Sequence, residues 1–221
     1  MGLFAVSCLG LSNCKKGYED RFGPFYILND TTIVVNGDMG SRVDNQLERL
    51  LDKYPNISYV VMEECPGSRD DEELFKAALM IHNRDVHIHL PSHAKIESGA
   101  VDFFLSGTKR TMDEGAKIGV HAWSDGNSSA TEYPVGHEEH QIYIDYYMSV
   151  GYSEQDAESL YFFIINAAGA RRSERGVTLV DRARFDWRRF PYFDADRQDT
   201  IITVSYTHLR AHETRGNLVC R

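Results

Sequence analysis

Short apolar runs and longer amphipathic segments alternate along the middle of the chain. The short runs, rich in β-branched residues, predict strands over residues 25–28, 32–35, 58–62, 86–90 and 117–121. The longer segments carry apolar residues three to four positions apart and predict helices over residues 44–51, 70–81, 98–106, 142–150 and 154–168. This strand–helix–strand alternation predicts an α/β fold with crossover helices.

The composition is that of an ordinary globular domain and excludes some functions. The chain has 221 residues, of which 42% are hydrophobic and 26% are charged, which suits one well-buried domain. A formal net charge of −9 gives a nucleic-acid partner no electrostatic support. No apolar run reaches the roughly 18–20 residues that a membrane-spanning helix needs. The four cysteines are not spaced as a zinc site or a redox pair, and nothing in the sequence predicts a cofactor or a metal.

The first residues predict export. Residues 1–11 form an apolar run about as long as the core of a signal peptide, although no basic residues precede it. Cys14 follows this run in a context that resembles a lipoprotein processing site, with Cys8 as its rival. We therefore expect residues 1–16 to be a signal peptide or lipoprotein signal, with Cys14 as the candidate lipid anchor of a periplasmic or otherwise exported protein. The alternative is the plain hydrophobic start of a cytosolic protein.

The last residues differ in character from the rest of the chain. Residues 204–214 resemble a translated sequencing-library transposon adapter, and residues 217–221 resemble the index-flanking adapter in the same frame. We expect residues 204–221 to be adapter-derived and exclude them from the fold. Lysine is absent after Lys117 while arginine crowds residues 171–197, so the segment 171–203 is either a basic surface or a mis-joined sequence.

Three local features carry candidate chemistry. The turn at 66–68 (Pro-Gly-Ser) leaves a predicted strand and exposes successive backbone N–H groups, which can stabilise an oxyanion. Ser98 begins a predicted apolar helix, where the helix dipole and the N–H of Gly99 lie beside its hydroxyl. His121 ends a short predicted strand and is a candidate base. A serine at such a position is, taken alone, more often a helix cap than a nucleophile.

In this order and spacing the features resemble the Clp protease proteolytic subunit and the crotonase superfamily around it. In that family a strand ends in Pro-Gly-Gly, and about thirty residues later the nucleophilic serine begins a helix that ends in an apolar run and Gly. A basic pair and a Gly-Ala-basic-apolar-Gly-apolar-His strand follow. The matching positions are residues 66–68, 98–107, 109–110 and 115–121. The chain most resembles predicted periplasmic Clp-like proteins.

The resemblance implies both a fold and an activity. It implies an α/β fold built as a Clp/crotonase-like spiral of ββα units over residues 22–170. It also implies that Ser98 attacks a peptide or acyl carbonyl, that His121 takes the proton, and that the backbone N–H groups of Ser68 and Gly99 form the oxyanion hole. We therefore expect an exported serine hydrolase, a peptidase acting on a peptide or protein substrate, that assembles as a homo-oligomer.

The chain departs from the family pattern at three places. Glu97 stands before Ser98 where the family has a small residue, and its charge is expected to oppose an oxyanion or to raise the pKa of His121. Ser68 replaces the second glycine of the turn. The family places a third catalytic acid near residues 170–176, where Glu174 is the only carboxylate. A catalytically inactive Clp-like scaffold or interaction protein is therefore the alternative, followed by a crotonase-type acyl-CoA enzyme.

Other histidine and aromatic clusters have simpler explanations. His87, His89 and His93 fit a half-exposed strand better than a metal site. The His137–His140 segment lacks the spacing of a zinc-protease helix and is expected to be a solvated helix start. The aromatic residues at 143, 146, 147 and 161–163 recur near helical spacing, which favours core or oligomer contacts over a ligand site.

Overall fold

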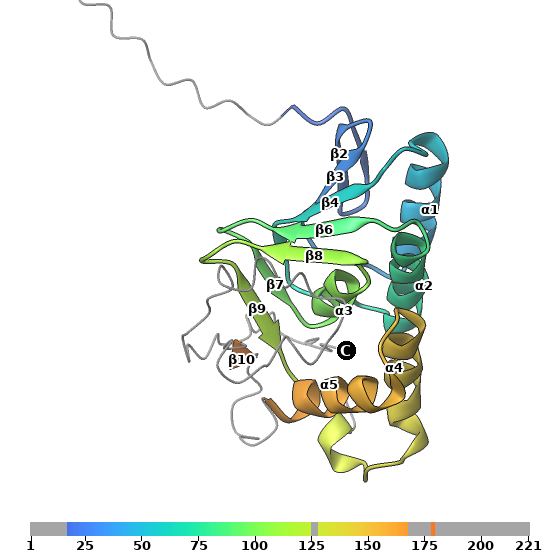
Figure 1. Cartoon of the computed structure of the whole chain (residues 1–221), viewed down its shortest axis with the longest axis vertical. Helices are drawn as coiled ribbons and strands as arrows, with labels where there is room; N and C mark the ends of the chain where they lie inside the picture. Colours follow the sequence, from blue (N-terminus) through green and yellow to red (C-terminus); the bar gives the residue numbers. More distant parts are fainter. Residues whose placement is uncertain (1–16, 125–127, 168–177, 180–221) are drawn as a thin grey trace, which may run out of the picture.

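The computed structural model describes residues 17–124, 128–167 and 178–179, in which two β-sheets pack with a set of helices (Figure 1). The larger sheet has six strands in the order β1-β2-β3-β4-β6-β8. Its strands are β1 (Asp20–Phe22), β2 (Phe25–Asn29), β3 (Thr32–Val35), β4 (Tyr59–Met62), β6 (His87–Leu90) and β8 (Lys109–Met112). Pairing is antiparallel from β1 to β3 and parallel from β3 onward, so each later strand is reached by a crossover.

The smaller sheet has the strand order β10-β9-β7-β5. Its strands are β5 (Glu64–Cys65), β7 (Lys95–Glu97), β9 (Lys117–Val120) and β10 (Thr178–Leu179). The first three in chain order are parallel, and β10 pairs antiparallel with β9. Met39 forms an isolated parallel bridge with Ser68, which extends this second layer by one more rung.

Each turn of the chain therefore visits the large sheet, the small sheet and a helix in that order. The helices are α1 (Val43–Lys53), α2 (Asp71–His82), α3 (Gly99–Leu105), α4 (Glu138–Ser149) and α5 (Glu154–Ala167), with a 3-10 turn η1 (Ala130–Glu132) before α4. The units β4-β5-α2 and β6-β7-α3 repeat this order, and β8-β9 begins it again. The predicted α/β fold and its spiral of ββα units are confirmed.

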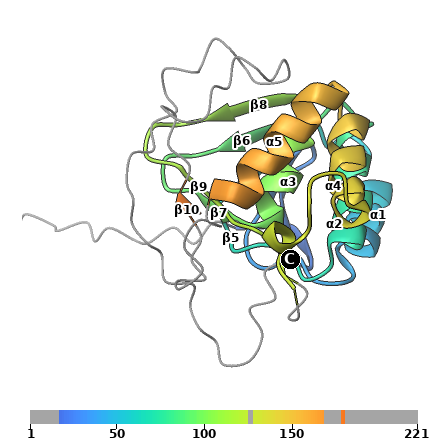
Figure 2. The ribbon, with the colours of Figure 1, turned by 90° about the horizontal axis from the view of Figure 1, so that it is seen from below.

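Helices α1 and α2 pack side by side along one flank of the molecule, with α4 in line with them and α5 crossing below (Figure 1). Seen from below, α5 passes across α3 and the small sheet (Figure 2). Amphipathic spacing explains α1, whose buried residues are Val43, Leu47, Leu50 and Leu51. A side-chain cap explains the start of α2, since Asp70 accepts a hydrogen bond from the backbone N–H of Glu73.

Helix α3 is the centre of the core because every one of its residues is buried. Phe103 and Phe104 have no exposed surface, and the ring of Phe103 lies 6.0 Å from that of Phe25 on β2. The buried side chains of the large sheet alternate along β2 and β4, as the strand period requires. Packing of α3 in the core therefore holds its first residue, Gly99, in place.

The structure agrees with the predicted elements except at their edges. Helix α4 begins at Glu138 rather than at residue 142, and the N-cap position of α1 is Arg42, without a side-chain cap bond, rather than Asp44. Strands β1, β5, β7, β8 and β10 are absent from the sequence prediction, because these short segments have no strand pattern of their own. They become strands through pairing with neighbours.

Several predictions concern residues outside the described part of the chain. The signal segment 1–16 with Cys14, the acid Glu174 and the adapter-like residues 204–221 all lie there, and those predictions stay predictions. Within the described residues, no helix is long and apolar enough to cross a membrane.

Truncation of Phe103 tests the central role of α3. We expect Phe103→Ala to lower the free energy of unfolding by about 3–5 kcal/mol, because a fully buried ring leaves a cavity that its neighbours fill only in part. Urea titration followed by far-UV circular dichroism measures this loss. Val135→Ala, at a side chain that is 79% exposed, is the control and should stay within about 0.5 kcal/mol of wild type. Equal losses in both variants would contradict the assignment.

Candidate active site

Ser98 lies at the junction of β7 and α3 in a strained backbone conformation. Its φ and ψ angles are 54° and −136°, a region that side chains other than glycine rarely adopt and that costs about 1–3 kcal/mol. Two hydrogen bonds hold it there: its N–H donates to the carbonyl of Gly119 at 3.0 Å, and its carbonyl accepts from Val101 at 2.8 Å. Such strain persists only where the surroundings determine it, and it is concentrated at functional sites.

The turn at 66–68 packs directly against Ser98. Gly67 has φ +136°, and a Cβ atom placed on it would lie 2.9 Å from Cβ of Ser98. A Cβ atom on Gly99 would overlap the hydroxyl of Ser68 and lie 2.8 Å from its Cβ. Both glycines are thus required by close approach, and the structure brings the predicted oxyanion turn and the predicted nucleophile together.

Neither of the two predicted oxyanion donors bonds to a described residue through its backbone N–H. Gly99 is the first residue of α3, where a backbone N–H has no partner within the helix. Ser68 lies outside any helix or strand, and its backbone N–H makes no hydrogen bond with a described residue. Donors in this state can turn to a ligand oxygen without breaking an existing bond.

A buried carboxylate that the sequence prediction missed anchors this turn. The hydroxyl of Ser68 donates to Oδ1 of Asp71 at 2.5 Å, and the hydroxyl of Tyr143 donates to Oδ2 at 2.6 Å. Asp71 is only 4% exposed, so these two donors stand in for the water that it has lost. The serine that replaces the family's second glycine therefore ties the turn to α2 and, through Tyr143, to α4.

His121 follows β9 and is level with the start of α3. Strand β7 pairs with β9 so that Glu97 is opposite Gly119, and the N–H of Ser98 donates to the carbonyl of Gly119, two residues before His121. Nδ1 of His121 lies 2.7 Å from the carbonyl oxygen of Ala122. Because a carbonyl oxygen can only accept, Nδ1 carries the proton, and Nε2 of the neutral ring is left as an acceptor.

Burial keeps this imidazole neutral. Loss of solvation lowers the pKa of His121 below its ordinary 6.5, while the bond to Ala122 and the charges of Glu97 and Asp71 oppose the shift. Nε2 is buried and has no hydrogen-bond partner among the described residues, Ser98 included. The predicted pair is therefore in one site but not hydrogen-bonded in this state.

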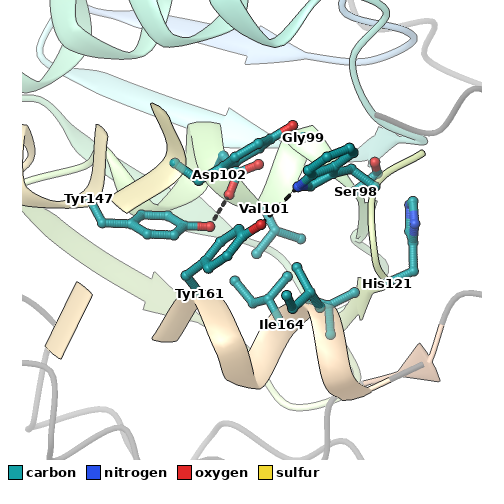
Figure 3. A pocket seen from close by; sticks show the side chains of 12 residues that line it. Ser98, Gly99, Val101, Asp102, His121, Tyr147, Tyr161 and Ile164 are labelled. Atoms are coloured by element: carbon teal, nitrogen blue, oxygen red, sulfur yellow. Dashed lines mark hydrogen bonds between the residues drawn. The ribbon is translucent and has the colours of Figure 1, made fainter. Parts of the chain in front are cut away.

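Ser98, Gly99 and His121 line one small pocket between α3, β9, α4 and α5 (Figure 3). The other lining residues are apolar or aromatic apart from one acid; they are Val101, Asp102, Val120, Trp123, Tyr143, Tyr147, Tyr161, Ile164 and Ile165. The pocket has a volume of about 20 Å³, which is room for a group the size of a water molecule. Ser68 is not one of its lining residues.

Asp102 is the second carboxylate that the sequence prediction missed. It lies one turn after Ser98 on α3, is 8% exposed, and accepts a hydrogen bond from the hydroxyl of Tyr147 (Figure 3). Burial raises its pKa to about 8, opposed by the bond from Tyr147. The available signal was a charged residue inside an otherwise apolar helix, since such a residue is rarely buried without a reason.

Glu97 points to a neighbouring lysine and does not line the pocket. Its Oε1 lies 2.9 Å from Nζ of Lys95, two residues earlier on the same strand, and its side chain is 13% exposed. The expectation that its charge favours protonated His121 agrees with the structure, but burial outweighs that effect. The lysine partner weakens the field of the carboxylate at the site.

The prediction for the His137–His140 segment was wrong for its last residue. His137 caps α4 and the next two residues are exposed, but His140 is only 1% exposed. Nδ1 of His140 lies 2.7 Å from the hydroxyl of Tyr161, which accepts from the indole N–H of Trp123 at 2.9 Å. These bonds satisfy the buried histidine and fix two walls of the pocket.

The other histidines and the buried thiol have local partners. His87 and His89 both lie 2.8 Å from the hydroxyl of Thr111, and His89 and His93 also pair with Asp113 and Glu63. Among the described residues no three potential ligands are grouped as a metal site. Burial raises the pKa of Cys65 to about 12, so this thiol is a poor nucleophile.

Comparison with known proteins gives matches only at the level of structure. No protein-family model matches the chain, and no curated protein matches it. It is similar to a mutant of the 1510-N membrane-bound stomatin-specific protease in complex with a substrate peptide, with a TM-score of 0.40 and 19% identity over 62% of this chain and 64% of that one. A second mutant of the same protease is similar with a TM-score of 0.41 and 17% identity, over 62% of this chain and 68% of that one.

A similarity of the same kind extends to the enoyl-CoA hydratase of Bacillus anthracis. Its TM-score is 0.33, with 13% identity over 40% of this chain and 45% of that one. The chain thus spans about two thirds of the protease and less than half of the hydratase. All three scores lie below 0.5, so the chemistry of this chain has to be argued from its own geometry.

Two glycine substitutions test the contact between the turn and Ser98. Gly67→Ala should lower the free energy of unfolding by more than Gly37→Ala, because both residues have positive φ but only Gly67 faces a neighbour. We expect about 1 kcal/mol for Gly37→Ala and at least twice that for Gly67→Ala. Chemical denaturation measures both. A loss at Gly67 no larger than at Gly37 would show that the turn and Ser98 are not in contact.

Proposed function

We propose that the protein is a serine hydrolase, a peptidase, in which Ser98 is the nucleophile and His121 is the base. The observation that carries this proposal is the strained φ of 54° at Ser98, at a strand–helix junction and in the same pocket as a histidine whose Nε2 bonds to no described residue. A serine that only caps a helix has no need of this backbone conformation. It uses the extended region and bonds to the backbone of the first turn, and Ser98 makes no such cap bond.

Each residue has a defined task in the proposed reaction. Oγ of Ser98 attacks the substrate carbonyl carbon while Nε2 of His121 takes the hydroxyl proton. The carbonyl oxygen gains the negative charge and is held by the N–H groups of Ser68 and Gly99. As the tetrahedral adduct collapses, His121 gives the proton to the leaving amine, and water then repeats the sequence to release the acyl group from Ser98.

A backbone carbonyl takes the orienting role in this proposal. The bond from Nδ1 of His121 to Ala122 fixes the tautomer in which Nε2 accepts, which in Ser-His-Asp enzymes is the task of the acid. Glu97 and Asp71 add a negative field that favours the imidazolium formed during the reaction. The proposed site therefore does not require Glu174, which lies outside the described residues.

A non-catalytic scaffold is the second candidate, because one specific observation favours it. Nε2 of His121 bonds to no described residue, so the bond from Ser98 to this imidazole is not formed in the state described. Catalytic hydrogen bonds are often long before substrate binds, and a small rotation of either side chain is enough to form one. The two candidates are separated by the reactivity of Ser98.

We also propose the localisation, the oligomeric state and the substrate class of the protein. Export to the periplasm, or anchoring through Cys14, depends on residues 1–16. Assembly as a homo-oligomer is supported by two large apolar side chains on α4, Ile142 and Met148, each 41% exposed. A peptide or protein is the proposed substrate.

Covalent labelling of Ser98 tests the proposed function. A fluorophosphonate should label the wild-type protein, since Oγ attacks phosphorus, fluoride leaves, and His121 takes the proton. Ser98→Ala should abolish labelling, and His121→Ala should slow it by at least about a hundredfold. Intact-mass spectrometry measures the adduct. Ser92→Ala, at an exposed loop serine, is the matched control and should label as wild type. An unlabelled wild-type protein would leave the scaffold as the better proposal.

The pH dependence of labelling tests the role of His121. Neutral imidazole is the active form, so the rate should rise with pH and reach half its maximum below pH 6.5, because burial disfavours the imidazolium. Glu97→Gln should move this midpoint lower still, since it removes a charge that favours the imidazolium. Stopped-time labelling between pH 4 and 9 gives the midpoint. A midpoint above 6.5 in wild type would show that a different group controls the reaction.

A further inference from the structure

Asp102 is a buried acid that has no cationic partner among the described residues. Its side chain is 8% exposed on a helix whose other residues are all buried. The hydroxyl of Tyr147 donates to Oδ1 at 2.5 Å, and no described lysine, arginine or histidine forms an ion pair with it. A buried carboxylate is normally paired with a cation or neutralised by a proton. Asp102 borders the pocket beside Ser98, so a ligand in this pocket can supply the missing charge.

Aromatic rings form the walls around this acid. The rings of Trp123 and Tyr143 stack at 5.9 Å, and those of Tyr143 and Tyr161 stack at 5.4 Å. Tyr147 and Tyr161 approach Asp102 from two different helices (Figure 3). The negative faces of aromatic rings attract cations, above all where water is excluded. An acid and several aromatic walls together favour a positively charged group over a neutral or acidic one.

The size of the pocket limits which cation fits. A volume of about 20 Å³ accommodates a group the size of a water molecule, which is the size of an ammonium group, whereas a guanidinium is larger. Asp102 lies four residues after Ser98, so the two Cα atoms are separated by about 6 Å along the helix. That length is about the length of the four-carbon stem of a lysine side chain.

We propose that this pocket binds the primary ammonium group of a substrate lysine, with Asp102 as the acceptor and the aromatic rings as walls. The hydrolase then prefers substrates with lysine as the residue whose carbonyl Ser98 attacks. This inference rests on the proposed function for its place in catalysis, but binding of the ammonium group does not depend on the reactivity of Ser98.

The protonation of Asp102 makes binding of an ammonium group depend on pH. Tyr147 on α4 donates to this carboxyl, whereas Tyr146 donates to the backbone carbonyl of Asp102. The other titratable groups around the carboxyl are Tyr143 on α4, Tyr161 on α5 and Asp71 on α2. Because the pKa of Asp102 is raised to about 8, the free protein holds the acid neutral at lower pH and an ammonium group has to displace its proton. Binding of an ammonium ligand should therefore strengthen as the pH rises through about 8, while a primary amine stays charged to about pH 10.

Binding of n-butylammonium chloride to the full chain tests the pocket alone. At pH 8.5 we expect it to raise the melting temperature more than equal concentrations of sodium chloride or n-butanol, and to do so less at pH 6. Asp102→Asn keeps the size and the bond from Tyr147 and should lose the effect, while Asp145→Asn, at an exposed position on α4, should keep it. Equal shifts with butylammonium and butanol in the wild-type protein would overturn the inference, and this comparison needs no variant.

Substrate preference tests the pocket in catalysis. Acetylated peptides with lysine, norleucine, arginine or glutamate before the cleaved bond should be hydrolysed with kcat/KM at least about tenfold higher for lysine than for norleucine. In Asp102→Asn that ratio should fall to about one. Labelling without a lysine preference overturns the inference and leaves the proposed function standing. Absence of labelling, with butylammonium binding intact, overturns the proposed function alone. Faster cleavage of unacetylated norleucine peptides than of the lysine peptides would assign the site to a free amino terminus and overturn the lysine assignment.

Discussion

The backbone of Ser98 is the constraint on which the rest of the site depends. A residue with a side chain is held at φ 54° because β9 takes its N–H, α3 takes its carbonyl, and Gly67 leaves no room for it to move. The helix that follows is buried on all sides, so the strain cannot relax by shifting α3. The hydroxyl, the first N–H of α3 and the turn at 66–68 are therefore placed by the core, not by the surface.

The two buried carboxylates near Ser98, Asp71 and Asp102, differ in their hydrogen-bond partners. Asp71 receives hydroxyl donors on both oxygens and acts as a structural acceptor that joins the turn to α2 and α4. Among the described residues Asp102 receives a hydroxyl donor on Oδ1 alone, and it borders the pocket. A fully satisfied acid gains nothing from a ligand, whereas a half-satisfied one in a dry site is a strong acceptor for a cation. The same residue type thus serves structure at one position and recognition at the other.

Loss of solvation also determines the protonation state of the candidate base, His121. Burial lowers the pKa of His121 and raises that of Asp102, so both groups are pushed toward their neutral forms in the free protein. A neutral imidazole accepts a proton, and a neutral acid gives one up when a cation arrives. The aromatic residues from α4 and α5 that exclude water are therefore as much a part of the site as the groups that they surround.

The sequence by itself determined the helices and the more apolar strands, because apolar periodicity records which face of each element is buried. The positions of Ser98, Ser68, Gly99 and His121 were also open to prediction, since they lie at element ends that the pattern marks. The tertiary structure alone decided the strands β7 and β8, the burial of His140, and the gathering of Asp71, Asp102 and the aromatic walls. These depend on contacts between segments far apart in the chain. The residue type of an acid does not by itself determine whether its side chain is buried or exposed.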